Sequence, residues 1–380
     1  MASMFTGRYP SQTGADWKTP LDPSHPTMTE AFEAHGYATG GFVANINYTG
    51  YRSGLARGFA HYEDARWSLR QVLLSTTVTQ SLSIVRAFVA WDLSDHWIGG
   101  TLRALWPPVV RHGGILMMHD IKLGKKMSAD FLDWLPTVSG RPFFAFLNFM
   151  DAHEPYVPPV PYRSMFGGEG VTWDRYRGAI RYLDDTVDQL LLELDRRGLL
   201  ESTIVVITSD HGDLFGEHGR RGHGNGLYPE LLHVPLLVLN APGAVAGTRV
   251  HQPVSLRDLA ATLLDLASIS RPDALGGTSL RPLLAGADTL ATASPVLAEL
   301  SVRSNYETLE TTKPALVALI QDSVHVVESA LGEVEFFAPP GTGNAEDVEP
   351  ISAAERQAAV ALLHQQLATQ GIAWKPGPGG

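Results

Sequence analysis

The chain has 380 residues, of which 44% are hydrophobic and 18% charged, so it can bury a large core and is neither a disordered nor a fibrous protein. It has 29 Lys and Arg against 40 Asp and Glu, a formal net charge of -11, and no long basic run. Affinity for nucleic acid depends on clustered cations, and we therefore expect no nucleic-acid partner.

The sequence contains no cysteine, which excludes disulfides, thiolate metal ligands and a cysteine nucleophile within it. Its most apolar stretch, residues 82–98, is interrupted by Arg86, Asp92 and Asp95, so we expect no transmembrane segment. No signal-peptide pattern opens the chain. These features leave localisation and oligomeric state open.

The first predicted elements are a short helix and a buried strand. Thr27 followed by Glu30 forms a capping box, and apolar residues continue from there at helical spacing. Residues 38–44 then predict a buried strand, and residues 143–150, FFAFLNFM, predict a second one. Between these strands, residues 64–128 are rich in Trp, Leu and Arg without strand alternation, and we expect a helical insertion there.

Helices and apolar strands alternate through the middle of the chain. Apolar residues three or four apart predict a long helix over residues 176–194, and a capped helix is expected over residues 255–266. Residues 204–208 and 234–239 are apolar almost throughout, as in strands covered on both faces. The pattern indicates an α/β fold, with a mostly parallel sheet between helices, over residues 1–290.

The last part of the chain has a different pattern. Four short apolar segments with polar turns between them predict an antiparallel sheet, at residues 296–299, 316–320, 324–328 and 334–337. A helix is expected over residues 353–367. We therefore expect a small C-terminal antiparallel subdomain over residues 291–370, followed by a disordered Gly/Pro tail over residues 371–380.

Polar residues follow two of the predicted strands, at the sheet edge where open parallel sheets bind ligands. Asp210 and His211 come directly after residues 204–208 and offer oxygen and nitrogen ligands to a divalent cation; the alternative is that Asp210 caps a helix. His153 follows the other strand and could act there as a proton donor or an anion contact. His223 lies in a Gly- and His-rich loop and has the same two possible roles. For both histidines the alternative is a structural side chain.

At these residues the chain resembles the sulfatase family of the alkaline phosphatase superfamily. Motifs along nearly the whole chain agree with the family in their order: TGRYPSQTG at 6–14, TMTEAFEAHGYATGGFVAN at 27–45, GLARGFAHYED at 54–64, RPFFAFLNFMDAHEPYVPP at 141–159, ITSDHGDLFGEHG at 207–219, RRGHGNGLYPELLHVPLLV at 220–238 and VSLRDLAATLLDLA at 254–267. The resemblance implies an alkaline phosphatase-like fold and a sulfuric ester hydrolase that uses a nucleophile beside a divalent cation. Calcium is the usual cation, with Mg²⁺ or Mn²⁺ as the other choices.

The resemblance also assigns roles to residues of this chain. It implies that Asp210 and His211 are metal ligands, that His153 is an active-site histidine, and that His223 contacts the substrate anion. The cation and the imidazoles would neutralise the sulfuryl oxygens as negative charge shifts in the transition state. One of the two imidazoles, His153 or His223, would protonate the leaving alcohol.

The chain departs from the family pattern at its start. The family nucleophile lies in a C/S-x-P-S/x-R pattern, and aligning on Thr6 places the end of that pattern at Met1. We therefore expect the nucleophile, and a first strand with two metal-binding Asp residues, to lie upstream. Ser3 is a nearby hydroxyl, but it fits a family position after the nucleophile. We expect the chain as given to be a fragment, inactive and poorly soluble because neighbouring strand edges are left unpaired.

The expected substrate is a small-molecule or glycan sulfate ester, and a second departure leaves room for another class. Many family members carry GKWHLG after the second strand, with its Lys and His on the sulfate, whereas this chain has VANIN at residues 43–47. Asn45 could donate a hydrogen bond to the anion in their place; the alternative is a side chain that caps a loop. A phosphonate or phosphodiester hydrolase or phosphotransferase of the same superfamily, and a non-catalytic truncated protein, are the other hypotheses.

Overall fold

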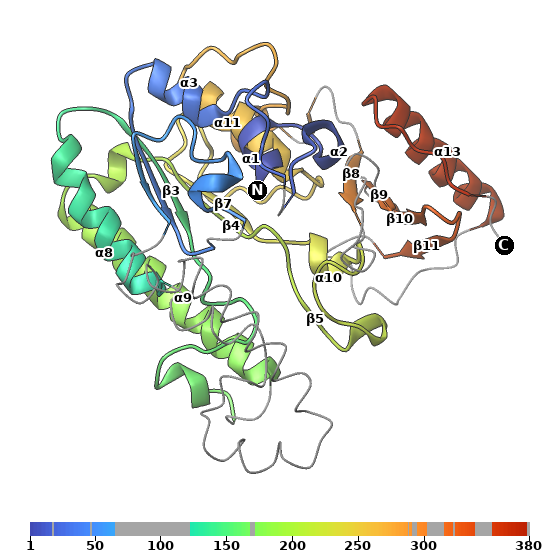
Figure 1. The fold of residues 1–380 in the computed structure, drawn as a ribbon, viewed down its shortest axis with the longest axis horizontal. Coiled ribbons are helices and arrows are strands. Elements are labelled where there is room, and N and C mark those ends of the chain that lie inside the picture. The colour runs from blue at the N-terminus through green and yellow to red at the C-terminus, as the bar shows by residue number, and fades with distance from the viewer. Residues whose placement is uncertain are drawn as a thin grey trace, which may run out of the picture.

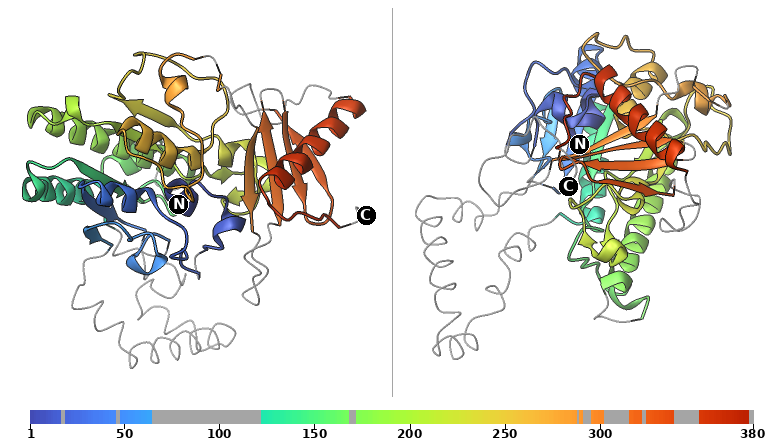
Figure 2. Two further views of the ribbon diagram at one scale, coloured as in Figure 1. Left: turned by 90° about the horizontal axis from the view of Figure 1, so that it is seen from above. Right: turned by 90° about the vertical axis from the view of Figure 1, so that its right-hand side faces the viewer.

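The computed structural model describes residues 1–16, 19–45, 48–64, 122–167, 172–287, 289–290, 295–301, 315–321, 324–338 and 352–377. Most of the predicted helical insertion, residues 65–121, lies outside these described residues. Two views of the ribbon show a larger part, in which helices cover strands, beside a small sheet crossed by one helix (Figure 1, Figure 2).

A three-stranded parallel sheet lies in the larger part. Its strands are β1 at Ala38–Val43, β2 at His61–Glu63 and β3 at Phe143–Asn148, in the order β2-β1-β3. The whole of β1 is buried, because it is the middle strand and is covered on its faces. A second pair of strands, β4 at Val205–Thr208 and β7 at Leu236–Leu239, is antiparallel. Within the described residues, β3 pairs only with β1, and β4 pairs only with β7.

The parallel pairing of β1, β2 and β3 confirms the α/β expectation, but the β4 and β7 pair departs from it. These two strands run antiparallel, and they are not covered equally on both faces. Val206 and Leu236 pack on a helical layer, whereas Leu237 points to the other face and is 50% exposed. A continuous apolar run does not reveal whether a helix lies on each of its faces, which is why the sequence did not distinguish the two cases.

Helices cover both faces of the parallel sheet (Figure 1). One layer contains α1, α3 and α11, and the opposite layer contains α8 and α9. Their bounds are Ala2–Thr6 for α1, Met28–Ala34 for α3, Leu259–Leu266 for α11, Gly124–Trp134 for α8 and Thr172–Arg196 for α9. Shorter helices are α2 at Pro10–Thr13, α10 at Pro229–Leu232 and α12 at Arg281–Leu284, with 3-10 turns at Tyr51–Ser53, Leu135–Val138, Tyr162–Ser164, Leu200–Ser202, Glu217–Gly219 and Leu256–Asp258.

The side chains of β3 alternate between the two layers, as the two-residue period of a strand requires. Phe144 and Phe146 pack on the layer that contains α1, α3 and α11. Phe143, Ala145 and Leu147 pack on the layer that contains α8 and α9. The apolar run FFAFLNFM thus supplies side chains to two hydrophobic clusters at once.

Two helix starts show how far the sequence determined the boundaries. The predicted capping box of α3 is present: the Thr27 hydroxyl accepts the Glu30 N–H at 3.2 Å, and the Glu30 carboxylate accepts the Thr27 N–H at 2.8 Å. By contrast, we assigned residues up to 128 to an inserted segment, and α8 already begins at Gly124. Met127 is fully buried against the sheet, so this end of the predicted insertion belongs to the main fold.

The small sheet has four antiparallel strands in the order β11-β10-β9-β8, with α13 at Ala353–Thr369 across one face. The strands are β8 at Val296–Leu300, β9 at Leu316–Gln321, β10 at Val324–Ser329 and β11 at Val334–Phe337. They confirm the predicted antiparallel unit. Val317 and Leu319 face α13, whereas Ala318 and Ile320 face a cluster formed with residues 214–231. The small sheet therefore supports the loop that carries several of the predicted site residues.

The chain after α13 is packed as far as it is described, which corrects our expectation of a disordered tail over residues 371–380. Ile372 is buried in the α13 cluster, and the Trp374 indole N–H donates to Glu328 at 2.6 Å. The Gly377 N–H donates to the Ala330 carbonyl at 2.8 Å. The Gly/Pro composition suggested disorder, but two large apolar side chains within it are enough to fix residues 371–377 on the small sheet.

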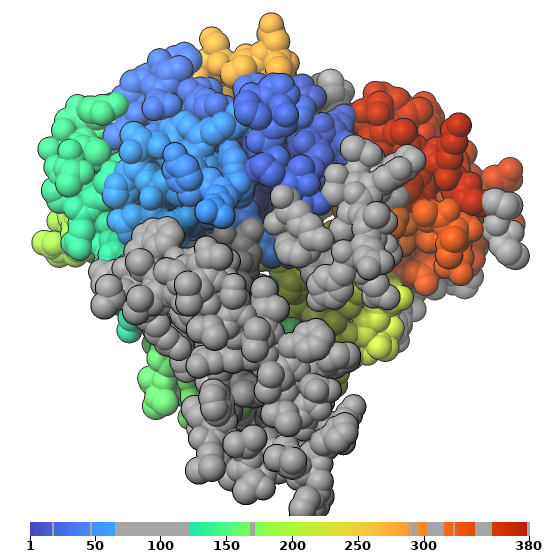
Figure 3. Space-filling view, viewed as in Figure 1, coloured from blue at the N-terminus to red at the C-terminus, as the bar shows by residue number. Residues whose placement is uncertain are grey.

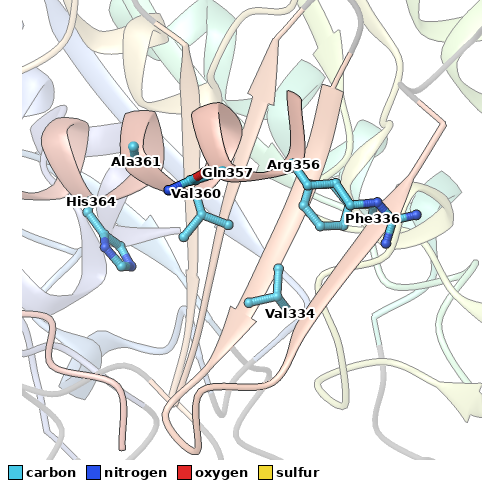
Figure 4. A pocket seen from close by; sticks show the side chains of 7 residues that line it. All are labelled: Val334, Phe336, Arg356, Gln357, Val360, Ala361 and His364. Carbon is cyan, nitrogen blue, oxygen red and sulfur yellow. The ribbon is translucent and has the colours of Figure 1, made fainter. Parts of the chain in front are cut away.

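An open groove of about 460 Å³ lies between α13 and β11 (Figure 4). Phe336, Val360 and His364 are among the side chains that line it. The groove is on the α13 face of the small sheet, whereas residues 214–231 pack on the opposite face. It is therefore separate from the predicted active site.

The N-terminal segment joins the two parts of the molecule. In the space-filling view it lies against the C-terminal helix region (Figure 3). Both the N–H and the hydroxyl of Ser11 donate to Glu299 at 2.9 Å, and the Gln12 side chain donates to the Gln370 carbonyl at 2.7 Å. None of the helices in the described ranges is long and apolar enough to cross a bilayer.

Candidate active site

The candidate site lies where β3 and β4 end. His153 follows β3, whereas Asp210 and His211 follow β4, and the structure brings them together with His223. The ring centroids are 4.2 Å apart for His211 and His223, 4.9 Å for His153 and His223, and 6.4 Å for His153 and His211. Asp210 Oδ1 lies 3.9 Å from His211 Nε2. The four residues that the sequence singled out therefore form one cluster.

A short hairpin explains why His223 reaches this cluster. Its strands are β5 at Leu214–Phe215 and β6 at Arg221–Gly222, and Leu214 pairs with Gly222. The next residues outward, Asp213 and His223, therefore lie across from each other. The Nδ1 atom of His223 is 2.8 Å from Asp213 Oδ1, and the Asp213 side chain is only 5% exposed. The sequence did not identify Asp213 because the hairpin strands are two residues long and have no periodicity.

Tyr156 makes the second contact of Asp213. Its hydroxyl donates to Asp213 Oδ2 at 2.5 Å, and its ring packs against those of Tyr176 and Phe215, at centroid distances of 5.2 and 5.7 Å. Tyr156 has a backbone φ of +53°, a left-handed conformation that is unfavourable for a bulky residue. Sequence reasoning also missed this residue, because its role depends on the loop conformation after β3.

Electrostatics couple the residues of this network. The hydrogen bond to Asp213 raises the pKa of His223, although burial acts in the opposite direction. Burial alone would raise the pKa of Asp213, but the hydrogen bonds from His223 and Tyr156 hold it below its usual value. Burial and the contact with Asp213 raise the pKa of Tyr156, so its hydroxyl keeps its proton. The network therefore favours an ionised Asp213 that accepts hydrogen bonds from His223 and Tyr156.

All three histidines of the cluster direct Nδ1 to an acceptor. His153 Nδ1 lies 2.9 Å from the Glu154 carbonyl, and His211 Nδ1 lies 2.8 Å from the Gly212 carbonyl. A carbonyl oxygen only accepts, so each of these Nδ1 atoms carries the proton. With the proton on Nδ1, a neutral ring at either position would present the lone pair of Nε2, which can bind a metal ion or accept a proton.

The residues present fit a divalent cation. Asp210 and His211 offer a carboxylate oxygen and the Nε2 lone pair, and both side chains are partly exposed. Ligand atoms of His211, Asp213 and His223 also lie within 4.8 Å of one another. Asp213 is already engaged by two donors, so Asp210 and His211 are the members of the cluster whose ligand atoms are better placed to bind an ion. Mixed oxygen and nitrogen donors of this kind suit several divalent metals.

Two neighbouring residues have structural tasks. The Asp151 carboxylate accepts the N–H of Gly124, at the start of α8, at 3.1 and 3.0 Å, so it caps that helix. Gly212 is in contact with the Glu230 carbonyl, and its N–H donates to the Leu231 carbonyl at 2.9 Å. A side chain at Gly212 would collide with that carbonyl. This close approach is the reason for glycine at position 212.

Asn45 and Ser3 lie at other points of the same region. The Asn45 side chain accepts the Tyr48 N–H at 3.1 Å and so caps a loop, while its backbone N–H donates to the Asn148 side chain at 3.2 Å. A substrate contact of Asn45 stays a prediction. Ser3 lies in α1, where its carbonyl accepts the Gly7 N–H. The start of α1 is close to the cluster, because the charge of Asp210 acts on the Met1 amino group, whose pKa burial lowers.

Comparison with known proteins settles the family. The sulfatase family model matches residues 1–269. The chain belongs to the sulfatase family. Arylsulfatase K from Homo sapiens is 30% identical over 306 residues, which cover 74% of this chain and 56% of the human protein. The chain thus spans little more than half the length of that sulfatase.

Solved structures of the same fold include members with different substrates. The phosphonate monoester hydrolase of Agrobacterium radiobacter superposes with a TM-score of 0.69 at 18% identity, covering 97% of this chain and 85% of that one. BT4656, solved in complex with its substrate D-glucosamine-2-N,6-O-disulfate, superposes with a TM-score of 0.57 at 17% identity, covering 97% and 87%. At this level of identity, these likenesses establish the fold, which is the predicted one.

Proposed function

We propose that this sulfatase-family chain carries the cation- and oxyanion-binding part of a sulfate-ester hydrolase. The observation that supports it is the convergence of Asp210, His211, His153 and His223 at the ends of two strands. Asp210 and His211 would hold the divalent cation. The resemblance to the family favours Ca²⁺, with Mg²⁺ or Mn²⁺ as alternatives, and the bound cation would supply positive charge to the ester oxygens.

The remaining residues have distinct proposed roles. His223, whose pKa is raised by Asp213, favours the cationic form, which can donate a hydrogen bond to an ester oxygen. His153 lies next to it and would exchange a proton with the leaving alcohol through Nε2. Asn45 would contribute a hydrogen bond to the anion if its loop opens on binding. The proposed substrate is the sulfate ester of a small molecule or a glycan, and the aminosugar disulfate bound by BT4656 supports the glycan class.

A phosphonate monoester or phosphodiester hydrolase is the second candidate. Two observations favour it: the likeness to the phosphonate monoester hydrolase, and the absence of Lys and His from residues 43–47, where many sulfatases contact the sulfate. The two candidates share the cation site and differ in the anion they accept. A substrate comparison therefore separates them, whereas a cation-binding measurement does not.

Cation binding tests the first half of the proposal. Isothermal titration of the 380-residue chain with Ca²⁺, Mg²⁺ and Mn²⁺ is expected to show one site, and Asp210→Asn and His211→Ala are each expected to weaken binding at least about tenfold. Asp184→Asn is the matched control, because Asp184 is an exposed acid on α9 with its side chain 68% exposed. Equal affinity in all four proteins would contradict the assignment of Asp210 and His211.

Anion selectivity tests the second half. Inorganic sulfate, phosphate and methylphosphonate are titrated into the cation-loaded chain, and chromogenic sulfate, phosphonate and phosphodiester substrates are assayed alongside. We expect sulfate to bind best and His223→Gln to weaken it, with no turnover by this chain, because the family's nucleophile pattern is not found in its sequence. Preference for methylphosphonate would favour the second candidate. Anion binding that is insensitive to His223→Gln would count against the oxyanion role.

A further inference from the structure

We infer that Asp213 and Tyr156 are positioning residues for His223: Asp213 fixes the tautomer of His223, and Tyr156 holds Asp213 in the orientation that does so. The inference rests on the proposed function, in which His223 contacts the ester. It adds two residues that the family motifs did not single out in this chain. Neither touches the substrate in this scheme, because both act through His223.

The geometry determines which nitrogen of His223 carries the proton. Asp213 Oδ1 lies 2.8 Å from Nδ1, and a carboxylate only accepts, so Nδ1 is the donor. Nε2 is on the far side of the ring from Asp213. His211 stacks on the ring at 4.2 Å, and His153 lies edge-on at 4.9 Å. The free nitrogen is therefore left for whatever binds among the three histidines.

His223 differs from its two neighbours in the kind of acceptor it uses. His153 and His211 donate Nδ1–H to the backbone carbonyl of the following residue, so their ring orientation is a local property of the loop. His223 instead donates to a side chain ten residues away, across the hairpin. The orientation of the His223 ring therefore depends on the hairpin register and on Asp213. A single substitution of Asp213 can remove this hydrogen bond without altering the backbone.

Tyr156 supplies the other constraint on Asp213. With one oxygen accepting from the Tyr156 hydroxyl at 2.5 Å and the other from His223, the carboxylate cannot rotate without losing a bond. Tyr156 is only 2% exposed and keeps an unfavourable φ of +53°. A strained backbone in a residue whose hydroxyl meets a buried carboxylate is typical of positions maintained for function. The rings of Tyr176 and Phe215 hold Tyr156 in place.

The tautomer of His223 can be measured directly and without turnover. In protein labelled with ¹⁵N-histidine, two-bond ¹⁵N–¹H correlation spectra distinguish a protonated Nδ1 from a protonated Nε2, and His223→Gln identifies the signals of His223. At pH 9 in EDTA, where the imidazole is neutral and no metal is bound, we expect protonated Nδ1. A wild-type protein with protonated Nε2 would overturn the inference whatever the variants do.

The same spectrum contains internal contrasts. His218 and His364 face the carboxylates of Glu230 and Glu328 through Nε2, at 3.1 and 2.7 Å, so their neutral rings are expected to carry the proton on Nε2. Glu230→Gln is a matched control because it removes an acid from the same region and leaves His223 untouched. It is expected to leave the signals of His223 unchanged.

Two variants separate the roles of the positioning residues. Asp213→Ala is expected to move His223 to mainly protonated Nε2, the form that a free imidazole prefers. Tyr156→Phe keeps the acceptor, so it should keep protonated Nδ1 and broaden the signals through motion of Asp213. If Asp213→Ala leaves the tautomer unchanged in a folded protein, the inference is wrong. If that variant does not fold, the wild-type and Tyr156→Phe spectra still decide.

Failure of this inference is distinguishable from failure of the proposed function. The tautomer is read in metal-free protein without substrate, whereas the proposed function is read from cation and anion binding. Protonated Nδ1 that depends on Asp213, in a chain that binds neither sulfate nor a cation, would support the positioning role and contradict the hydrolase. In a chain that does bind sulfate, Asp213→Ala is expected to weaken sulfate affinity by about 10 to 100-fold, and Glu230→Gln is not.

Discussion

His325 makes the stability of this protein sensitive to acid, and His325→Leu should remove that sensitivity. The side chain lies on β10, is fully buried and packs against Phe337 at a centroid distance of 5.5 Å. Within the described part of the chain, neither ring nitrogen makes a hydrogen bond of good geometry, although the Leu227 backbone is near enough to oppose part of the effect of burial on the pKa. Burial therefore disfavours the charged ring and lowers its pKa to about 4, from an ordinary value of 6.5.

The sign of the effect follows from proton uptake. Between pH 6.5 and 4 the unfolded chain binds a proton at His325 and the folded chain does not, so the free energy of unfolding falls as the pH is lowered through this window. From pH 7.5 to 4.5 this one group should cost about 2–3 kcal/mol. The pKa values of Asp151, Asp258 and Glu299 are raised, so these groups change the free energy of unfolding in the opposite direction as the pH falls. They are present in both wild type and His325→Leu, and their effect cancels in the comparison.

The measurement is urea unfolding of wild type and His325→Leu at several pH values. At pH 7.5 the variant should be as stable as wild type or slightly more stable, because it removes buried polar atoms without partners. At pH 4.5 it should be more stable by about 2–3 kcal/mol. His251→Gln, an exposed histidine, is the control and should run parallel to wild type. Stability curves of wild type and His325→Leu that stay parallel over this range would refute the reasoning.

Three further changes test the packing around the site and between α13 and the small sheet. Asp151→Ala removes the acceptor of the Gly124 N–H and should cost about 1–2 kcal/mol in urea unfolding, with faster amide exchange at the start of α8; unchanged exchange there would argue against the cap. Leu363→Ala should cost about 2–5 kcal/mol in urea unfolding, because this side chain of α13 is completely buried against the small sheet; a smaller loss would contradict that packing. Gly212→Ala should displace the Glu230 carbonyl and weaken cation binding at the site, and an unaltered affinity would show that the loop tolerates the shift.

Much of the fold could be predicted because its signals are local. The capping box at Thr27 and the apolar run at residues 143–148 carry their own evidence, and the structure places a helix start and a strand there. The four C-terminal strands were located to within a residue or two for the same reason. What failed depended on context. The coverage of Leu237 and the packing of Ile372 depend on neighbours far away in the chain.

The candidate site shows the same division. Asp210, His211 and His153 follow predicted strands, so their convergence was expected from the edge of the sheet alone. The contact between Asp213 and His223 follows from the pairing of Leu214 with Gly222, and a hairpin of two-residue strands leaves no trace in hydrophobic periodicity. Tyr156 depends in addition on a left-handed backbone after β3. A search for acids placed symmetrically about a Gly-rich turn could have suggested Asp213.

The contacts of the N-terminal segment join it to parts of the chain that are synthesised much later. Arg8 donates to the Ala274 carbonyl at 2.9 and 2.7 Å, and Gln12 donates to the carbonyl of Gln370, 358 residues later. These hydrogen bonds of Arg8 and Gln12 can therefore form only after Ala274 and Gln370, respectively, have been translated. Phe5, by contrast, packs against Phe59 and Phe146 and can be covered earlier. The N-terminal segment is thus anchored in two stages, first within the larger part of the molecule and last to the segment that follows α13.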